Sequence, residues 1–179
     1  MIEKEENETS YSMEGIAFGL ADGVICCLGL TIGVAEATSS TTLVIIAGII
    51  GGLANAFGNS IGFYMSQSAE RALQIHETEE HGVTTRIHSK REVVTSSLFS
   101  FAATIIALII LLSPFVFFNM TIATILTFIF GTLLSFILGS YVGKLARYSR
   151  YKMGFQYAIL AIAGAIISHL VGDLLSILM

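Results

Sequence analysis

Hydrophobic positions along this chain form long runs that are almost free of charge, separated by short polar segments. Between Glu14 and Glu36 the only charged residue is Asp22, and the ranges 37–69, 93–143 and 153–172 contain no charged residue. A helix needs roughly 20 mostly apolar residues to cross the hydrocarbon core of a bilayer. The pattern predicts five transmembrane helices, over about 15–36, 43–67, 94–114, 119–143 and 154–178.

The run over 93–143 is long enough for two spans and has to be divided. Ser113-Pro114, followed by Asn119, is the natural break, because proline ends or kinks a helix near the residue before it. A single helix over the whole run would exceed the bilayer thickness about twofold. The sequence therefore predicts that the third helix ends at Pro114.

Composition supports a membrane protein rather than a soluble domain. Apolar residues make up 54% of the 179 residues and charged residues only 12%, about half of what a soluble domain carries. The fold class predicted is an all-α integral membrane protein, with an acidic tail over 1–14, a five-helix domain over 15–179, and a short charged segment over 70–92. The net charge of −4 argues against nucleic-acid binding. The first residues are acidic rather than basic, so the first span is expected to remain uncleaved.

Basic residues fall on one side of the predicted spans. All nine lie in the N-terminal tail, between the second and third spans, or between the fourth and fifth spans: Lys4, Arg71, Arg86, Lys90, Arg91, Lys144, Arg147, Arg150 and Lys152. Positively charged segments stay in the cytoplasm. This predicts a cytoplasmic N-terminus and a C-terminus outside, in a multi-pass protein of the cell membrane.

Glycines recur at four-residue spacing in the first two spans. The ladders are Gly15, Gly19 and Gly23; Gly29 and Gly33; Gly48 and Gly52; and Gly58 and Gly62. Small residues at this spacing let helices approach closely in lipid. They serve either packing within the chain or an oligomer interface. The span over 94–114 lacks the pattern and is predicted to face lipid.

Asp22 is the carboxylate inside the first span, and an ionisable group in hydrocarbon is expensive. Cys26 shares its helical face, and Asn55 and Asn59 share a face of the antiparallel second span, with Asn59 at about the depth of Asp22. Carboxylate and amide oxygens suit hard divalent cations, and a thiol favours softer metals. The alternative is that these groups only hold helices together by hydrogen bonds, with Cys26 as a small packing residue.

A second cluster occupies the charged segment over 70–92. Glu77 and His81 are four residues apart, as are His76 and Glu80, with Glu70 one to two turns before them. On a helix that continues from the second span, these side chains would gather divalent metal at the mouth of a pathway. The alternative is a solvated charged loop.

His169 and Asp173 are also four residues apart, near the far end of the fifth span. Together with Asp22 they are candidates for a proton relay or an exit. The alternative is a hydrogen-bonded pair close to the interface.

Four stretches resemble the vacuolar iron transporter family. The first span contains Gly19-x-x-Asp22-Gly23, the second contains Gly-Asn-Ser-Ile-Gly-Phe-Tyr over 58–64, and the last two spans carry Gly-x-x-x-Gly-Lys-Leu-Ala-Arg-Tyr-Ser-Arg over 139–150 and Leu-Val-Gly-Asp-Leu-Leu over 170–175. The resemblance covers most of the chain from residue 15 on. It implies a homodimer of five-span subunits that moves Fe(II) or Mn(II) out of the cytosol by exchange for protons. The aspartate that the family has in its first span falls on Asp22.

The second span departs from the family pattern. Gly51 and Phe63 align with positions where the family has glutamates, and Asn59 aligns with its metal-binding methionine. Only the segment over 70–92 stands where larger members insert a glutamate-rich helical domain. Asn55 and Cys26 are the candidate replacements for the missing ligands.

Two functions follow from the sequence. The first is a divalent iron or manganese transporter, with the metal as cargo and no permanently bound cofactor. The alternative is a non-transporting scaffold or partner subunit on the same fold, as the departures from the family pattern suggest. An enzyme is not predicted, because no nucleophile–base pair or zinc-type His/Glu motif has the required spacing.

Overall fold

The computed structural model describes residues 2–82 and 87–178, with side chains from Met13 onward apart from that of residue 81. The described residues form helices and connections without a strand. The helices are α1 (Ile2–Thr38), α2 (Thr41–His81), α3 (Lys90–Phe117), α4 (Met120–Leu145) and α5 (Arg150–Leu178). Each is long and apolar enough to cross a membrane. The prediction of an all-α protein with five spans is confirmed.

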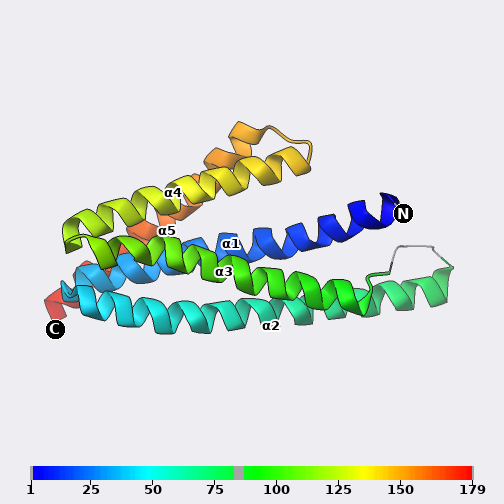
Figure 1. Cartoon of the computed structure of the whole chain (residues 1–179), viewed down its shortest axis with the longest axis horizontal. Helices are drawn as coiled ribbons and strands as arrows, with labels where there is room; N and C mark the ends of the chain where they lie inside the picture. The colour runs from blue at the N-terminus through cyan, green and yellow to red at the C-terminus, as the bar shows by residue number, and fades with distance from the viewer. Residues whose placement is uncertain (1, 83–86, 179) are drawn as a thin grey trace.

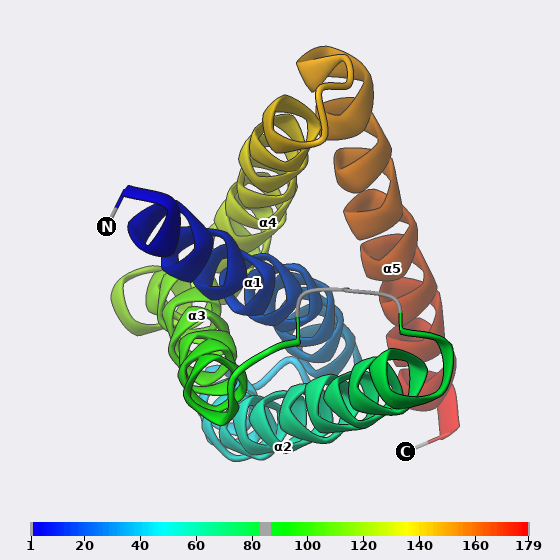
Figure 2. The same ribbon diagram turned by 90° about the vertical axis from the view of Figure 1, so that its right-hand side faces the viewer.

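Helix α1 lies at the centre of the bundle. It packs against all four other helices, whereas α2 packs on α1 and α3, and α5 packs on α1 and α4. Viewed along the bundle, α2 and α3 lie on one side of α1 and α4 and α5 on the other (Figure 2). Successive helices alternate in direction, so the chain starts and finishes at opposite ends of the bundle (Figure 1). Groups on α1 therefore meet residues from every other helix.

Helix α3 is packed within the bundle, so its predicted lipid exposure is wrong. Half of its most apolar window is buried, the largest share among the five spans described. The reason is the glycine ladder of α1. A Cβ at Gly15 or Gly19 would overlap the carbonyl oxygen of Ser96 or Ser100, and a Cβ at Gly23 would lie 3.0 Å from the Thr104 Cα. Because α1 and α3 run in the same direction, three matched pairs at four-residue spacing form one close seam.

Pro114 lies inside α3, which contradicts the predicted end of the third helix at this residue. A proline ring removes the N–H that would bond to the carbonyl four residues earlier. The Ser113 hydroxyl donates to this carbonyl, that of Ile110, at 2.9 Å. Serine side chains commonly satisfy backbone groups freed by proline in membrane helices. The helix therefore continues to Phe117, and Asn119 caps the start of α4 by accepting from the Ile122 N–H at 3.1 Å.

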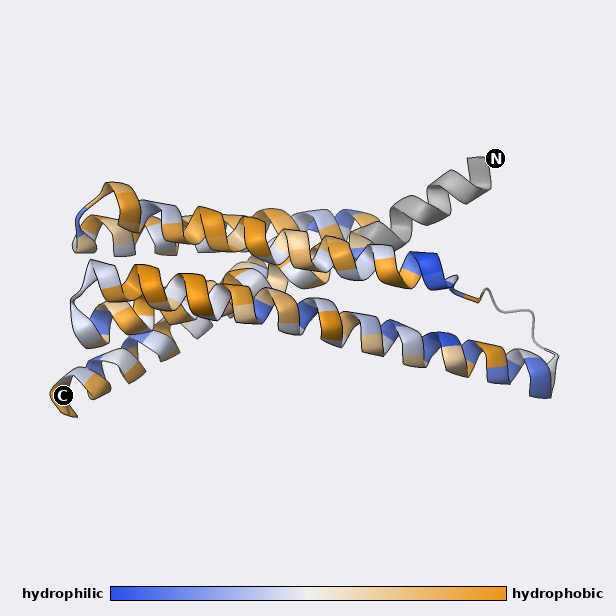
Figure 3. Ribbon diagram, turned by 60° about the horizontal axis from the view of Figure 1, so that its bottom comes forward, coloured by the Kyte–Doolittle hydropathy of each residue, from blue (hydrophilic) through white to orange (hydrophobic). Residues whose placement is uncertain are grey.

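Helix α2 extends well beyond the predicted bilayer crossing, to His81. The segment from Ser66 onward is rich in strong helix formers, and it ends only at Gly82, whose φ of 63° is the left-handed conformation typical of a helix C-cap. Helix α3 begins at a capping box formed by Ser89 and Glu92. Most of the charged segment over 70–92 is therefore helical rather than a loop. Polar residues gather at this end of α2 and α3 (Figure 3).

The glycines of α2 divide into two groups. Gly48 and Gly52 face α3, where an added Cβ would crowd Leu112 and Leu108. Gly58 and Gly62 are exposed, and in the part of the chain that the structure describes no other helix has a heavy atom within 4 Å of a Cβ added at either position. The first pair serves packing within the chain, whereas the second pair lies on a face of α2 that this chain leaves open.

Candidate functional site

Three contacts fix how α1 and α2 are aligned around Asp22. The rings of Phe18 and Phe63 lie 5.3 Å apart, Asn59 bonds to Asp22, and a Cβ at Gly51 would touch Leu30. In each pair a step along α1 is matched by an equal step backwards along α2, as antiparallel helices require. Cys26 and Asn55 fall at the same level between these pairs.

Asp22, Asn59 and Thr104 join three helices by side-chain hydrogen bonds. Asn59 Nδ2 donates to Asp22 Oδ2 at 2.9 Å and to Thr104 Oγ1 at 3.0 Å. Thr104 Oγ1 lies 2.9 Å from the Gly19 carbonyl oxygen and 3.0 Å from that of Ser100, and its one proton serves one of them at a time. Asn59 is 8% exposed and Thr104 fully buried, while Asp22 is half-buried. The network fixes the carboxylate but leaves it reachable.

At this site, oxygen atoms that could bind a cation are not used in the hydrogen bonds of the network. Both amide hydrogens of Asn59 are used, and within the described part of the chain no hydrogen bond is found to Asn59 Oδ1 or to Asp22 Oδ1. Asn55 and the half-buried Cys26 lie one helical turn further, and the buried Nδ2 of Asn55 has no partner in this region. Carboxylate and amide oxygens are ligands for hard divalent ions. The same hydrogen bonds also join the helices, which is the role that the alternative interpretation gives to these residues.

No group of three or more His, Cys, Asp or Glu side chains that could hold a metal ion occurs among the described residues. In the hydrogen-bonded network described above, Asp22 is the one carboxylate, and Asn59 and Thr104 are neutral. Such a set holds an ion more weakly than a cage of several carboxylates. A transport site needs ligands that bind a passing ion and also release it.

The predicted residues of the charged segment lie on the extension of α2 beyond its apolar part. His76 Nε2 lies 3.5 Å from Glu80 Oε2, and both side chains are largely exposed. Glu70 Oε1 accepts from Gln74 at 3.3 Å. Glu77 is exposed, and the side chain of His81 lies outside the described residues. The structure therefore places these groups along one polar helix.

His88 is a polar residue at this end that the site prediction did not include. It is 7% exposed, and its Nδ1 lies 3.0 Å from Gln67 Oε1. Arg71 Nε donates to the His88 carbonyl oxygen at 2.7 Å, and Gln74 Oε1 accepts from its N–H at 3.0 Å. Glu14 on α1 interacts electrostatically with His88. These bonds hold the start of α3 against α2, with an α1 carboxylate beside them.

His169 pairs with Glu36, which was not among the predicted site residues. Its Nδ1 lies 3.1 Å from Glu36 Oε2, which joins α5 to α1. Asp173 is exposed, and no bond between it and His169 is found in the described region. Glu36 and His169 therefore meet at the end of the bundle opposite the basic residues, while Asp22 lies further inside.

On the face of α2 that packs against α1, two positions are in close contact with side chains of α1. Gly51 lies against Leu30, and Phe63 against Phe18. The family resemblance puts glutamates at these two positions. Along this face the polar groups that remain are Asn55 and Asn59, one turn apart and level with Cys26 and Asp22.

Thr104 is the part of the network that the sequence prediction missed. A signal for it exists, because Ser96, Ser100 and Thr104 repeat the four-residue spacing of the α1 glycines. Serine and threonine thus act here with glycine as small residues of a helix interface.

Comparisons with known proteins agree with the resemblance. The model of the VIT family matches residues 14–81 and 67–173. A relative, the uncharacterized protein MJ0645 of Methanocaldococcus jannaschii, is 27% identical over 175 residues, which cover 93% of this chain and 89% of the relative. The two matched ranges span all five helices and include Asp22, Asn59 and Thr104.

Proposed function

The chain belongs to the VIT family, whose members are metal ion transporters, and from this premise we propose that it moves a divalent transition metal, iron or manganese, out of the cytosol in exchange for protons. The metal is cargo in this proposal. No permanently bound cofactor and no catalytic step are part of it.

The observation that carries this proposal is the network of Asp22, Asn59 and Thr104. It holds a half-buried carboxylate at a fixed position on the central helix. A carboxylate inside a membrane span is expensive and marks ion and proton pathways. Asp22 Oδ1 and Asn59 Oδ1 supply oxygen ligands, and Cys26 and Asn55 are the next polar groups on the same pair of helices.

Proton exchange follows from the chemistry of a carboxylate in hydrocarbon. A bound cation favours the charged form of Asp22, while burial without a cation favours the protonated form. Metal and proton therefore compete for the same group. Once the metal is released outside, Asp22 takes up a proton from that same side and later gives it up to the cytosol, which couples the two movements in opposite directions.

We further propose that the protein is a homodimer that uses the open face of α2. Ala54, Gly58, Gly62 and Ser66 are exposed small residues at four-residue spacing. Among the described residues, no heavy atom outside the adjoining turns of α2 lies within 4 Å of a Cβ added at Gly58 or Gly62. Small residues at this spacing support close helix pairs in lipid. The partner on this face is a second copy of the chain.

The proposed setting is the cell membrane, with the basic end of the bundle in the cytoplasm. Arg71, Lys90, Arg91 and Lys144 lie at this end. The charged extension of α2, with Glu70, His76, Glu77 and Glu80, then faces the side from which metal enters. Its exposed carboxylates and imidazoles would raise the local concentration of divalent cations.

Metal flux in proteoliposomes tests the proposal. Purified protein is reconstituted with a metal-sensitive dye inside, and Fe(II), Mn(II) and Zn(II) are added in turn with and without a pH gradient. Flux of Fe(II) or Mn(II) that increases with the gradient is expected for the unaltered chain. Asp22→Asn keeps the size of the side chain but cannot exchange a proton, so flux is expected to fall to background.

Glu79→Gln is the matched control, because it removes an exposed carboxylate on α2 that takes no part in the network and is not among the predicted metal or proton-relay residues. Its flux is expected to equal that of the unaltered chain. Full activity of Asp22→Asn would reject the proposed mechanism. Equal flux at all pH gradients would reject proton exchange while leaving metal transport in place.

A non-transporting scaffold is the second candidate, because Gly51 and Phe63 pack against α1 where the resemblance predicts glutamates. Thermal unfolding with and without metal distinguishes the two functions. A transporter that binds Fe(II) or Mn(II) in its folded state is stabilised by that metal. A scaffold shows neither stabilisation nor flux.

A further inference from the structure

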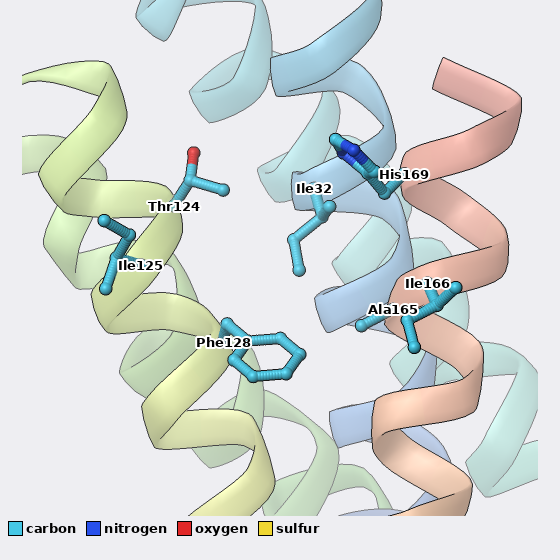
Figure 4. Close-up of a pocket in the computed structure, with 7 residues that line it drawn as sticks. All are labelled: Ile32, Thr124, Ile125, Phe128, Ala165, Ile166 and His169. Atoms are coloured by element: carbon cyan, nitrogen blue, oxygen red, sulfur yellow. The ribbon is translucent and has the colours of Figure 1, made fainter. Parts of the chain in front are cut away.

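A groove opens between α1, α4 and α5 at the end of the bundle opposite the basic residues. Its deeper part is a cavity of about 310 Å³, shown in Figure 4. The residues that line it are Ile32, Thr124, Ile125, Phe128, Ala165, Ile166 and His169. Most of these side chains are apolar, and an apolar cavity stays free of water and takes up hydrocarbon.

A second cavity of about 300 Å³ continues the first towards the end of the bundle. Its lining is Ala35, Glu36, Ser39, Met120, Thr121, Thr124 and Ile125. Because Thr124 and Ile125 line both cavities, the two adjoin along α4. We call them together the α4–α5 groove.

The α4–α5 groove changes in polarity along its length. Phe128, Ile32 and Ala165 line the inner part. The outer part holds the Glu36 carboxylate and the hydroxyls of Ser39 and Thr121. An occupant that fits both parts is an amphipath, with hydrocarbon inside and a polar group at the rim.

Charge at the rim selects the polar group. The lysines and arginines whose side chains the structure describes, from Arg71 to Lys152, lie at the other end of the spans. The ionisable side chains described at this end are Glu36, His169 and Asp173. Glu36 Oε2 lies 3.1 Å from His169 Nδ1, and Glu36 lines the outer part of the groove. A carboxylate in a region without fixed cations favours a cationic group.

Size limits the hydrocarbon that the groove accepts. The inner cavity of about 310 Å³ is roughly twice the ~150 Å³ of an apolar cavity that binds benzene. This leaves room for part of one hydrocarbon chain, not for two. A groove left empty in the bilayer would cost its lining the dispersion contacts on one side.

We propose that the α4–α5 groove binds phosphatidylethanolamine from the bilayer, with one acyl chain against Phe128 and Ile32 and the headgroup ammonium at Glu36. The second acyl chain stays in the surrounding lipid. The ammonium group donates hydrogen bonds to the carboxylate, a charge-assisted interaction that an anionic headgroup lacks. This lipid site is separate from the Asp22 network and does not depend on metal transport.

Thermal unfolding in detergent micelles tests the lipid site. The protein is titrated with phosphatidylethanolamine or with phosphatidylglycerol of the same acyl chains, and retained lipid is counted by native mass spectrometry. Phosphatidylethanolamine is expected to raise the unfolding temperature more and to be retained at lower concentration. Glu36→Gln is expected to abolish this preference, whereas Asp173→Asn, the matched loss of a carboxylate at the same end, keeps it.

Filling the groove gives a second, independent measurement. Thr124→Phe places a ring in the shared wall of both cavities and is expected to remove stabilisation by either lipid. Ile129→Phe, at an exposed α4 position outside the lining, is expected to leave it unchanged. If Glu36→Gln does not fold, phosphatidylcholine of the same acyl chains is titrated into the unaltered chain instead and is expected to stabilise it less, because a trimethylated ammonium cannot donate a hydrogen bond to Glu36. Equal effects of the two lipids on the unaltered chain, or an unchanged response of Thr124→Phe, would overturn the proposal.

Discussion

Asn59 is the residue on which the geometry around Asp22 depends most. Its amide group donates to a carboxylate on α1 and a hydroxyl on α3, so one side chain ties three helices together. Without Asn59, the Asp22 carboxylate would lose its bonded donor in hydrocarbon, where unsatisfied polar groups are costly. Asn59 therefore serves stability and positions the candidate metal ligand.

Replacing Asn59 by alanine is expected to lower the free energy of unfolding in mixed micelles by about 1–2 kcal/mol, since two interhelical hydrogen bonds are lost. Asn55→Ala is the matched control one turn away, because Asn55 Nδ2 has no partner in the described region. Its effect is expected to be less than half as large. Equal losses for the two variants, measured by denaturant titration, would argue that the network does not stabilise the fold.

The sequence predicted part of this residue-level picture. Counting turns along two antiparallel helices places Asp22 and Asn59 at one depth, and the hydrogen bond between them agrees with this. It did not place Thr104, because the position of the third helix relative to the first depends on close packing rather than on depth. Glu36 and His169 lie 133 positions apart in the sequence. They likewise meet only because α5 packs on α1.

Of the helix contacts at which glycines lie, the seam between α1 and α3 is the closest. Carbonyl groups of Ser96 and Ser100 occupy the space that a side chain at Gly15 or Gly19 would need. In lipid, helix association is driven by such packing and by interhelical hydrogen bonds. The Thr104 bond to the Gly19 carbonyl lies in this same seam, so packing and the candidate site share one interface.

Gly19→Ala is expected to destabilise the fold by about 1–3 kcal/mol, because the added methyl group forces α1 and α3 apart. It is also expected to reduce metal flux, since Thr104 moves away from Asn59. Gly164→Ala is the control, with Ile25 Cγ2 at an ordinary 3.7 Å from the added Cβ. Unfolding and flux are measured for both variants. A Gly19→Ala protein as stable as Gly164→Ala would show that the seam relaxes at no cost.

At the scale of the whole molecule, α2 and α5 are the least buried spans, with 22% of their apolar windows buried. Lipid can cover most of this surface, but the small residues of α2 offer little side chain to lipid. An interface between two copies would use this face, whereas the α4–α5 groove lies on the other side of α1 (Figure 2).

Gly58→Leu combined with Gly62→Leu is expected to convert the dimer to monomers, because branched side chains would hold the two α2 helices apart. The molar mass of the protein in detergent, measured by light scattering, checks this outcome. Ala163→Leu adds similar bulk at an exposed position of α5 and is expected to leave the dimer intact. A monomeric unaltered chain, or a dimeric double variant, would contradict the interface.

Cysteine labelling in whole cells tests the orientation. In a chain with Cys26 and Cys27 replaced by alanine, Thr42→Cys lies at the end without basic residues and Ser149→Cys beside Arg147 and Arg150. A membrane-impermeant maleimide is expected to label only Thr42→Cys, because basic segments remain in the cytoplasm. Labelling of Ser149→Cys instead would reverse the proposed direction of export.

Hydrophobicity and charge by themselves determined that this chain is a five-span membrane protein, because the cost of placing polar groups in hydrocarbon acts on each segment separately. They also marked Asp22 and Asn59, since depth follows from counting residues along a helix. Tertiary structure decided which helix faces are buried, because in lipid both buried and exposed faces are apolar. For this reason tertiary structure alone decided that half of α3 is buried, that this helix continues past Pro114 beside Ser113, and which partners Thr104 and Glu36 have.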